Sequence, residues 1–186
     1  MYKRQEEIVS VIGANRVGDR PAQVDWILTD SRSLCFPEET LFFALKTKRN
    51  DGHKYIEELY ARGVYNFVVT EIPKKMQGCK DINFLVVSNV LKALQRLAAK
   101  HREQFDVPVV GITGSNGKTV VKEWLYQLLS PERRITRSPR SYNSQIGVPL
   151  SVWMMDSHTE LGIFEAGISE MGEMEALEPI IRPTIG

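Results

Sequence analysis

The chain has 186 residues, of which 42% are hydrophobic and 25% carry a charged side chain, and its formal net charge is +1. This composition is typical of a globular protein and does not favour disorder. A net charge so close to zero gives no global attraction to nucleic acid or to anionic lipid, and no apolar run approaches the length that spans a bilayer.

The N-terminal residues lead into no long apolar stretch, so we expect no secretory signal. The two cysteines, Cys35 and Cys79, lie far apart and lack the spacing of metal ligands. We therefore expect free, packed thiols in a reducing cytoplasm.

Residues 1–106 have the pattern of one small α/β unit. Five apolar segments in this part have the length and composition of strands. They are residues 10–13, 24–30, 40–45, 64–70 and 82–87. A helix is predicted from His53 to Arg62, with Gly63 as its C-cap, and residues 74–81 are predicted to form a turn.

A longer helix is predicted to begin after Ser88, which would cap it, because apolar residues recur there with helical spacing. These residues are Val90, Leu91, Leu94, Leu97, Ala98 and Phe105. His101 lies near this stripe, and we interpret it as a packed or boundary histidine rather than a ligand.

Residues 107–186 alternate strands and helices, which predicts a parallel sheet with helices on both faces. The predicted strands are 107–112, 133–137, 161–165 and the beginning of one at 183–186; the predicted helices are 118–129, 145–155 and 171–178. The sequence therefore predicts an incomplete doubly wound domain. Ligands of such sheets gather at the carboxyl ends of the strands, which is where Glu165 lies.

The segment Gly111–Thr119 follows an apolar strand and reads Gly-Ile-Thr-Gly-Ser-Asn-Gly-Lys-Thr. Glycines allow backbone N–H groups to close around phosphate oxygens, and the next helix presents its positive end. Lys118 would reach the β- and γ-phosphates of a nucleotide, and Thr119 would face Mg²⁺. Ile112 occupies a position where the Walker A pattern has glycine, so an ordinary glycine turn remains the alternative.

Together with this loop, three further parts of the chain resemble the Mur ligases, the ATP-dependent amide-forming enzymes of peptidoglycan synthesis. They are residues 29–32 with 41–46 and 51–53, residues 143–150, and residues 164–167 with 172–174. Their order and spacing agree with the family over essentially the whole chain. The similarity is greatest to the branch that joins D-alanyl-D-alanine to UDP-N-acetylmuramoyl-tripeptide.

The resemblance implies a UDP-recognition domain over residues 1–106 and part of a P-loop ATP-binding domain over residues 107–186. It implies ATP and Mg²⁺ as cofactors and an acyl-phosphate intermediate. The loop residues implied in nucleotide binding are Thr113, Gly114, Ser115, Asn116, Gly117, Lys118 and Thr119.

The resemblance also assigns roles outside the loop. Lys118, Glu165 and Asn143 would be catalytic, and Thr119 and Glu165 would bind Mg²⁺ through hard oxygen atoms. Two alternatives stay open: Glu165 as a partner in a structural ion pair, and Asn143 as a turn former.

For the substrate, Ser31, Arg32 and Lys46 would contact the uridine diphosphate part. The alternatives are a turn cap with a solvated arginine for the first two and a surface lysine for the third. The chain departs from the family pattern at Val120, at Ser144 and at Glu170, which replaces a histidine near a second metal in many members.

Two other functions remain open: a Mur ligase that adds a single amino acid, and a non-catalytic nucleotide or UDP-sugar binding module. We interpret the basic residues near the loop as a solvated face, because no aromatic platform for nucleic acid accompanies them. They are Arg133, Arg134, Arg137 and Arg140. We interpret the chain as an inactive fragment whose exposed sheet edge and apolar surface would favour self-association.

Overall fold

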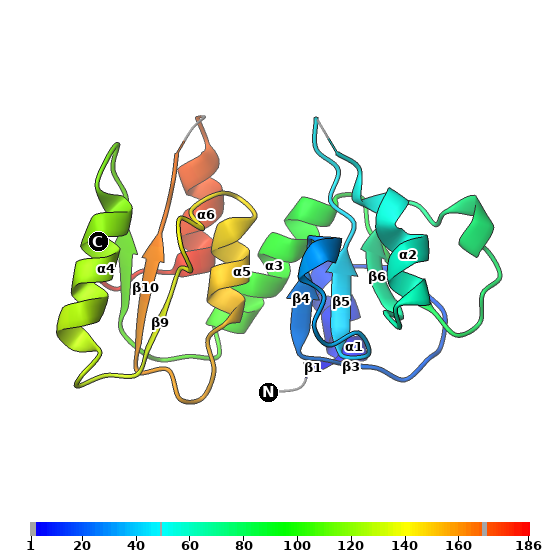
Figure 1. Cartoon of the computed structure of the whole chain (residues 1–186), viewed down its shortest axis with the longest axis horizontal. Coiled ribbons are helices and arrows are strands. Elements are labelled where there is room, and N and C mark those ends of the chain that lie inside the picture. The colour runs from blue at the N-terminus through cyan, green and yellow to red at the C-terminus, as the bar shows by residue number, and fades with distance from the viewer. Residues whose placement is uncertain (1–2, 49, 169–170) are drawn as a thin grey trace. The chain divides into compact units, whose positions relative to one another are not determined.

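The computed structural model describes residues 3–48, 50–168 and 171–186. The chain divides into two compact units, Met1–Leu94 and Gln95–Gly186, and the division falls inside helix α3, Val90–Arg102 (Figure 1). The predicted domains, 1–106 and 107–186, stay a prediction. Among the described residues, no helix combines the length and apolar character needed to cross a membrane.

The first unit is built on a five-stranded sheet with the strand order β2-β7-β6-β5-β4. Its strands are β2 (Asn15–Val17), β4 (Trp26–Leu28), β5 (Thr40–Phe43), β6 (Asn66–Val69) and β7 (Asn83–Val86). β4 to β7 run parallel and β2 is an antiparallel edge strand. A separate antiparallel pair joins β1 (Lys3–Arg4) to β3 (Gln23–Val24).

Aromatic residues at the same level of three neighbouring strands form the core of this sheet. Phe42, Phe67 and Phe84 are paired in register, with ring centroids 6.2 Å and 5.8 Å apart along the row. They pack in one cluster with Ile56 and Leu59 of helix α2, Ile56–Ala61. This row fixes the register of β5, β6 and β7, so the segments that leave their carboxyl ends start from a rigid sheet.

The remaining helical elements of this unit lie between its strands. They are α1 (Gln5–Ile12) and the 3₁₀ turns η1 (Ser31–Ser33), η2 (Gly52–Tyr55) and η3 (Lys74–Met76). The helix predicted at 53–62 is confirmed as η2 followed by α2, and Gly63 adopts a φ of 90° after it.

Most predicted strands of the first unit are confirmed, with shorter bounds, but the strand predicted at 10–13 is wrong. Residues 10–12 complete α1 and Gly13 forms the turn after it. Ile8 and Ile12, one helical turn apart in α1, are both buried. Ser88 is not the cap of α3 either, because the Lys92 amide donates to Oδ1 of Asn89 at 2.9 Å.

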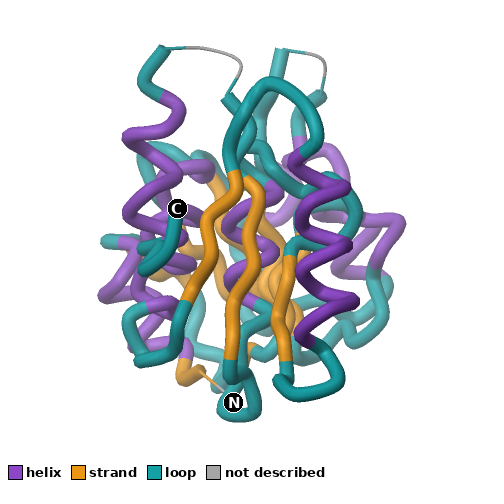
Figure 2. The backbone as a smooth tube through the Cα atoms, turned by 90° about the vertical axis from the view of Figure 1, so that its left-hand side faces the viewer, coloured by secondary structure: helices purple, strands orange, loops and turns teal. Residues whose placement is uncertain are grey.

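The second unit has a parallel three-stranded sheet with the order β8-β10-β9. Its elements are β8 (Val109–Ile112), α4 (Lys118–Leu129), β9 (Ile135–Arg137), α5 (Gly147–Trp153), β10 (Leu161–Glu165) and α6 (Glu173–Ile181). Figure 2 shows the strands of this unit side by side with helices to either side. The predicted α/β class and parallel sheet are confirmed.

Strand β10 is buried on both faces, as a central parallel strand requires. Phe164 packs in a cluster with Val148 of α5 and Leu177 of α6, whereas Glu165 contacts α4. The predicted start of a fourth strand is confirmed, since Ile185 forms a parallel bridge with Val110 and accepts a hydrogen bond from the Gly111 amide at 2.9 Å.

Two predictions about single residues have different outcomes. His101 is 5% exposed and its Nε2 lies 2.9 Å from the carbonyl oxygen of Met155, which confirms a packed histidine. Cys35 and Cys79 are free thiols, as predicted, but both are exposed, so the prediction that they are packed is wrong.

Candidate active site

The glycine-rich loop joins the carboxyl end of β8 to the first turn of α4. Gly114 has a φ of 134° and Gly117 a φ of 79°, values that residues with a Cβ rarely adopt. Gly117 is the N-cap of α4, and the Lys118 ammonium folds back to donate to the Gly114 carbonyl at 2.6 Å. The loop therefore places a lysine and a helix N-terminus around one exposed turn, an arrangement suited to an anion.

Glu165, the last residue of β10, lies beside this loop. Its side chain is fully buried, and the hydroxyl of Thr119 donates to its Oε2 atom at 3.0 Å. Its backbone amide donates to the hydroxyl of the buried Ser138, which directly follows β9. The carboxyl ends of all three strands thus converge on one point, as parallel α/β sheets predict.

This point has the donor chemistry of a magnesium site. Two cis ligands of an octahedral Mg²⁺ lie about 3 Å apart, given metal–oxygen distances of about 2.0–2.1 Å, and Thr119 Oγ1 and Glu165 Oε2 are 3.0 Å apart. No cluster of three or more His, Cys, Asp or Glu side chains suited to a metal occurs among the described residues. A cation here would therefore depend on these two atoms, on water and on phosphate oxygens, which is usual for Mg²⁺.

Lys122 is the main residue of this site that the sequence analysis missed. Its side chain is fully buried, and its ammonium lies 2.8 Å from Glu165 Oε1 and 3.3 Å from Glu123 Oε1. Glu165 thus belongs to an ion pair, one of the two alternatives left open, while its other oxygen faces Thr119. Lys122 follows Thr119 by three residues, so helical periodicity places both on one face of α4. This spacing is the sequence feature from which Lys122 could have been predicted to lie near the site.

Asn143 also lies at the carboxyl end of β10. Its carbonyl accepts a hydrogen bond from the Gly167 amide at 2.7 Å, and a Cβ on Gly167 would come within 3.0 Å of the Asn143 amide carbon. The hydroxyl of Ser141, in the same loop, is 3.4 Å from Thr119 Oγ1. The structure brings Asn143 to this edge of the sheet, and its catalytic role stays a prediction.

The three departures from the family pattern differ in their surroundings. Val120 is half exposed on α4, and the Ser144 hydroxyl accepts from the Gly147 amide at 3.1 Å, at the start of α5. Glu170 lies outside the described residues.

The first unit carries a separate pocket of about 370 Å³. Its walls are Thr29, Asp30, Ser31, Arg32, Asn50 and Tyr55. Ser31 and Arg32 were predicted to bind substrate, whereas Asn50 and Tyr55 were not found from the sequence. Lys46 is not part of this wall; its ammonium lies 3.6 Å from Asp51 Oδ2.

Asp30 and Arg32 form a closed pair at one side of the pocket. The Asp30 carboxylate accepts from the Arg32 amide at 3.1 Å and pairs with its guanidinium at 2.6 Å. The side-chain hydrogen bond to Arg32 lowers the pKa of Asp30 and raises the pKa of Arg32. The turn cap considered for this segment is present, and it leaves Arg32 exposed at the pocket.

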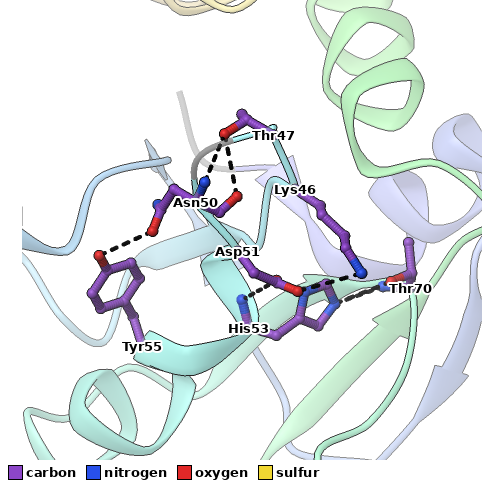
Figure 3. Close-up of polar contacts among 7 residues, drawn as sticks. All are labelled: Lys46, Thr47, Asn50, Asp51, His53, Tyr55 and Thr70. Atoms are coloured by element: carbon purple, nitrogen blue, oxygen red, sulfur yellow. Dashed lines mark hydrogen bonds and ion pairs between the residues drawn. The ribbon is translucent and has the colours of Figure 1, made fainter.

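Figure 3 shows the contacts of the segment that contributes Asn50 and Tyr55 to the pocket, residues 46–48 and 50–55. Asp51 Oδ1 accepts from the His53 amide at 3.0 Å and lies 2.6 Å from His53 Nδ1. Nε2 of the same ring accepts from the Thr70 amide at 3.1 Å. Because Nε2 is an acceptor, the neutral ring carries its proton on Nδ1, and this N–H donates a hydrogen bond to Asp51.

The ionisation of Asp51 reflects these contacts. Partial burial opposes it, but the hydrogen bonds from the His53 amide and ring and the charge of Lys46 outweigh burial and lower the pKa of Asp51. The ring therefore links the segment that carries Asn50 and Tyr55 to the carboxyl end of β6.

A family model and individual related proteins both indicate similarity to the Mur ligases. Residues 112–186 match the Mur ligase middle domain. The UDP-N-acetylmuramoyl-tripeptide–D-alanyl-D-alanine ligase of Borreliella burgdorferi is 37% identical over 79% of this chain and 33% of its own length. The ligase of the same name from Bacillus subtilis is 33% identical over 84% of this chain and 34% of its own length.

Solved structures agree. MurF from Acinetobacter baumannii superposes with a TM-score of 0.88 at 27% identity, over 98% of this chain and 40% of that one. MurF from Thermotoga maritima, solved with ADP, gives a TM-score of 0.72 at 30% identity, over 84% of this chain and 35% of that one. The chain spans about a third of the length of the curated relatives it matches.

Proposed function

The chain belongs to the Mur ligase family, and we propose that it is part of a MurF-type enzyme that joins D-alanyl-D-alanine to UDP-N-acetylmuramoyl-tripeptide at the expense of ATP. The observation that carries the proposal is the position of Thr119 at the start of α4, 3.0 Å from the buried Glu165. The relatives that bear this enzyme's name support the choice of substrates.

In the proposed reaction the substrate carboxylate attacks the γ-phosphorus of ATP, and ADP leaves. The amine of the dipeptide then attacks the acyl phosphate, loses a proton, and phosphate departs from the tetrahedral intermediate. Lys118 leaves the Gly114 carbonyl and neutralises charge on the β- and γ-phosphates, while residues 113–117 surround them with backbone groups. Thr119 and Glu165 would hold Mg²⁺, which neutralises phosphate charge when bound.

The pocket of the first unit would receive the uridine diphosphate part of the substrate. Ser31 and Arg32 contribute polar and cationic groups, and Tyr55 and Asn50 add an aromatic ring and an amide suited to a nucleobase. Lys46, which does not line this pocket, would meet the pyrophosphate. We place the enzyme in the cytoplasm, which the two exposed free thiols fit.

The direct test is amide formation by the full-length enzyme, measured by mass spectrometry with ATP and UDP-N-acetylmuramoyl-tripeptide. We expect product with D-alanyl-D-alanine and none with single amino acids. Turnover with a single amino acid alone would indicate another branch of the family. Nucleotide binding without product from any amine would indicate a binding module.

A further inference from the structure

Lys122 has three partners, contributed by three parts of the second unit. Its ammonium contacts Glu165 Oε1 at 2.8 Å at the end of β10, contacts Glu123 Oε1 at 3.3 Å within α4, and donates to the carbonyl oxygen of Arg140 after β9. An ammonium group has three N–H donors. The ammonium therefore lies close to all three of these oxygen atoms, and the side chain is 0% exposed.

The neighbouring charges assign Lys122 to Glu165 rather than to Glu123. The guanidinium of Arg137 already pairs with the same oxygen of Glu123, and it stacks over the Tyr126 ring at 3.9 Å. Glu165 is fully buried, and Lys122 is the cation that the structure places against it. A buried carboxylate without a cation is costly, so Lys122 is held on Oε1 of Glu165.

The two carboxylate oxygens of Glu165 therefore have different partners. Oε1 faces the ammonium of Lys122, and Oε2 faces the hydroxyl of Thr119 at 3.0 Å. We propose that Lys122 is a positioning residue that restricts Glu165 to binding a divalent cation through Oε2 alone. The inference rests on the proposed nucleotide site.

The restriction has a consequence for metal specificity. Mg²⁺ takes six ligands in strict octahedral geometry and binds carboxylates through single oxygens, whereas Ca²⁺ takes six to eight ligands and accepts both oxygens of one carboxylate. Lys122 excludes the second mode at Glu165. It thereby selects Mg²⁺ over Ca²⁺ at the site beside the phosphate loop.

The test measures Kd for Mg²⁺ and for Ca²⁺ by calorimetry in the presence of saturating ADP, with the full-length protein. In Lys122→Met we expect the ratio of the Ca²⁺ to the Mg²⁺ Kd to fall about tenfold, because Oε1 becomes available to Ca²⁺. Lys122→Arg, which keeps the charge, should retain the ratio, and so should Lys92→Met, which removes an exposed lysine of α3.

An unchanged ratio in a Lys122→Met protein that melts cooperatively would overturn the inference and leave the proposed function intact. Absence of metal-dependent ADP binding in the unaltered protein would instead overturn the proposed function, and the inference with it. A purely structural role for Lys122 would lower the melting temperature without moving the ratio.

A second measurement does not depend on a variant that folds. In a crystal structure of the unaltered protein with ADP and Mn²⁺, Glu165 should bind the metal through Oε2 while Oε1 stays on Lys122. Both carboxylate oxygens on the metal, or Lys122 turned away from Glu165, would overturn the inference.

Discussion

Lys118 and Thr119 are neighbours in sequence but have different partners. Lys118 folds onto the carbonyl of Gly114, within its own loop, whereas Thr119 donates to Glu165 on another strand. The first contact is exposed, and in the proposed site it would break when a phosphate binds. The second is partly buried and joins the first turn of α4 to the end of β10.

Removing the Lys118 ammonium should therefore affect the reaction more than the fold. For Lys118→Ala in the full-length enzyme we expect kcat/KM to fall by about a hundredfold or more, which corresponds to about 3 kcal/mol of transition-state stabilisation. Steady-state kinetics of ADP release measure it, with Lys92→Ala as the control. An unchanged kcat/KM in Lys118→Ala would exclude the assigned role.

The position of Gly52 has no room for a Cβ atom. A Cβ at this position would lie 2.8 Å from backbone atoms of Ala44. The Gly52 amide donates to the Leu45 carbonyl at 2.8 Å. The segment that carries Asn50 and Tyr55 thus passes directly over Ala44 and Leu45, the two residues that follow β5.

We expect Gly52→Ala to destabilise the protein by about 1–3 kcal/mol, because backbone atoms have to move apart to admit the methyl group. Thermal unfolding followed by circular dichroism measures the change. Gly186→Ala is the control, since a methyl group there would have nothing within 4 Å of it. Equal losses in both variants would contradict the contact argument.

In the segment of residues 46–48 and 50–55, Lys46 and Asp51 form the base, where the segment meets the rest of the first unit. Lys46 and Asp51 form an antiparallel bridge, and the amide of Thr47 donates to the Asn50 carbonyl at 2.8 Å. Asp51 and the ring of His53 then tie the segment to Thr70 at the end of β6. The side chains of Asn50 and Tyr55 depend on this base for their position at the pocket.

Lowering the pH should weaken the contacts that Asp51 makes at this attachment, because protonation removes the negative charge of its carboxylate. Its pKa is lowered in the folded state, so its contribution to stability is complete above the unfolded-state pKa of about 3.9 and is lost as pH falls through the lower folded-state pKa. We expect the melting temperatures of the unaltered protein and Asp51→Asn to differ above about pH 5, and the difference to shrink as the pH falls below about 4 toward the folded-state pKa. A difference that is constant across this range would contradict the assignment.

The elements that the sequence predicts best are those with a clear period or a glycine boundary. The bounds of α4 and β10 were predicted residue for residue, because Gly117 and the apolar run 161–164 mark them. Residues 10–13 were assigned to a strand because a run of four is too short to show helical periodicity. The pair of Lys122 with Glu165 needs the distance between α4 and β10, which no local pattern contains.

For the site, the glycine-rich pattern indicated the loop and the family resemblance indicated Glu165. Their position at one edge of the sheet followed from the parallel strand order, and the structure confirms that position. Asn50 and Tyr55 were missed because they reach the pocket through a loop whose path depends on Gly52 passing over Ala44. Arg32 was found, but its closed pair with Asp30 follows from a local turn that the sequence left as an alternative.

At the scale of the whole chain, the exposed side of α4 carries apolar side chains that could mediate self-association. Trp124 is 65% exposed and Leu128 74% exposed, and Val121 lies one turn before Trp124. Ile185, beside β8, is also exposed. Solvated apolar residues that recur on one helix face favour association.

We expect the chain of 186 residues to self-associate through this face as its concentration rises. Light scattering measures the mass, and Trp124→Glu should shift the protein toward the monomer because it places a charge at the centre of the face. Gln127→Glu, which adds the same charge to the same helix, is the control. A monomer at every concentration would contradict the prediction.

The turn between β8 and α4 is the feature on which the assigned function depends, because it is proposed to hold the phosphates of a nucleotide beside Glu165. The decisive test is a crystal structure of the full-length protein with a non-hydrolysable ATP analogue and Mg²⁺. We predict that residues 113–117 enclose the phosphates, with the Lys118 ammonium moved from the Gly114 carbonyl to a phosphate oxygen. An analogue bound elsewhere, with Lys118 still on Gly114, would contradict this assignment.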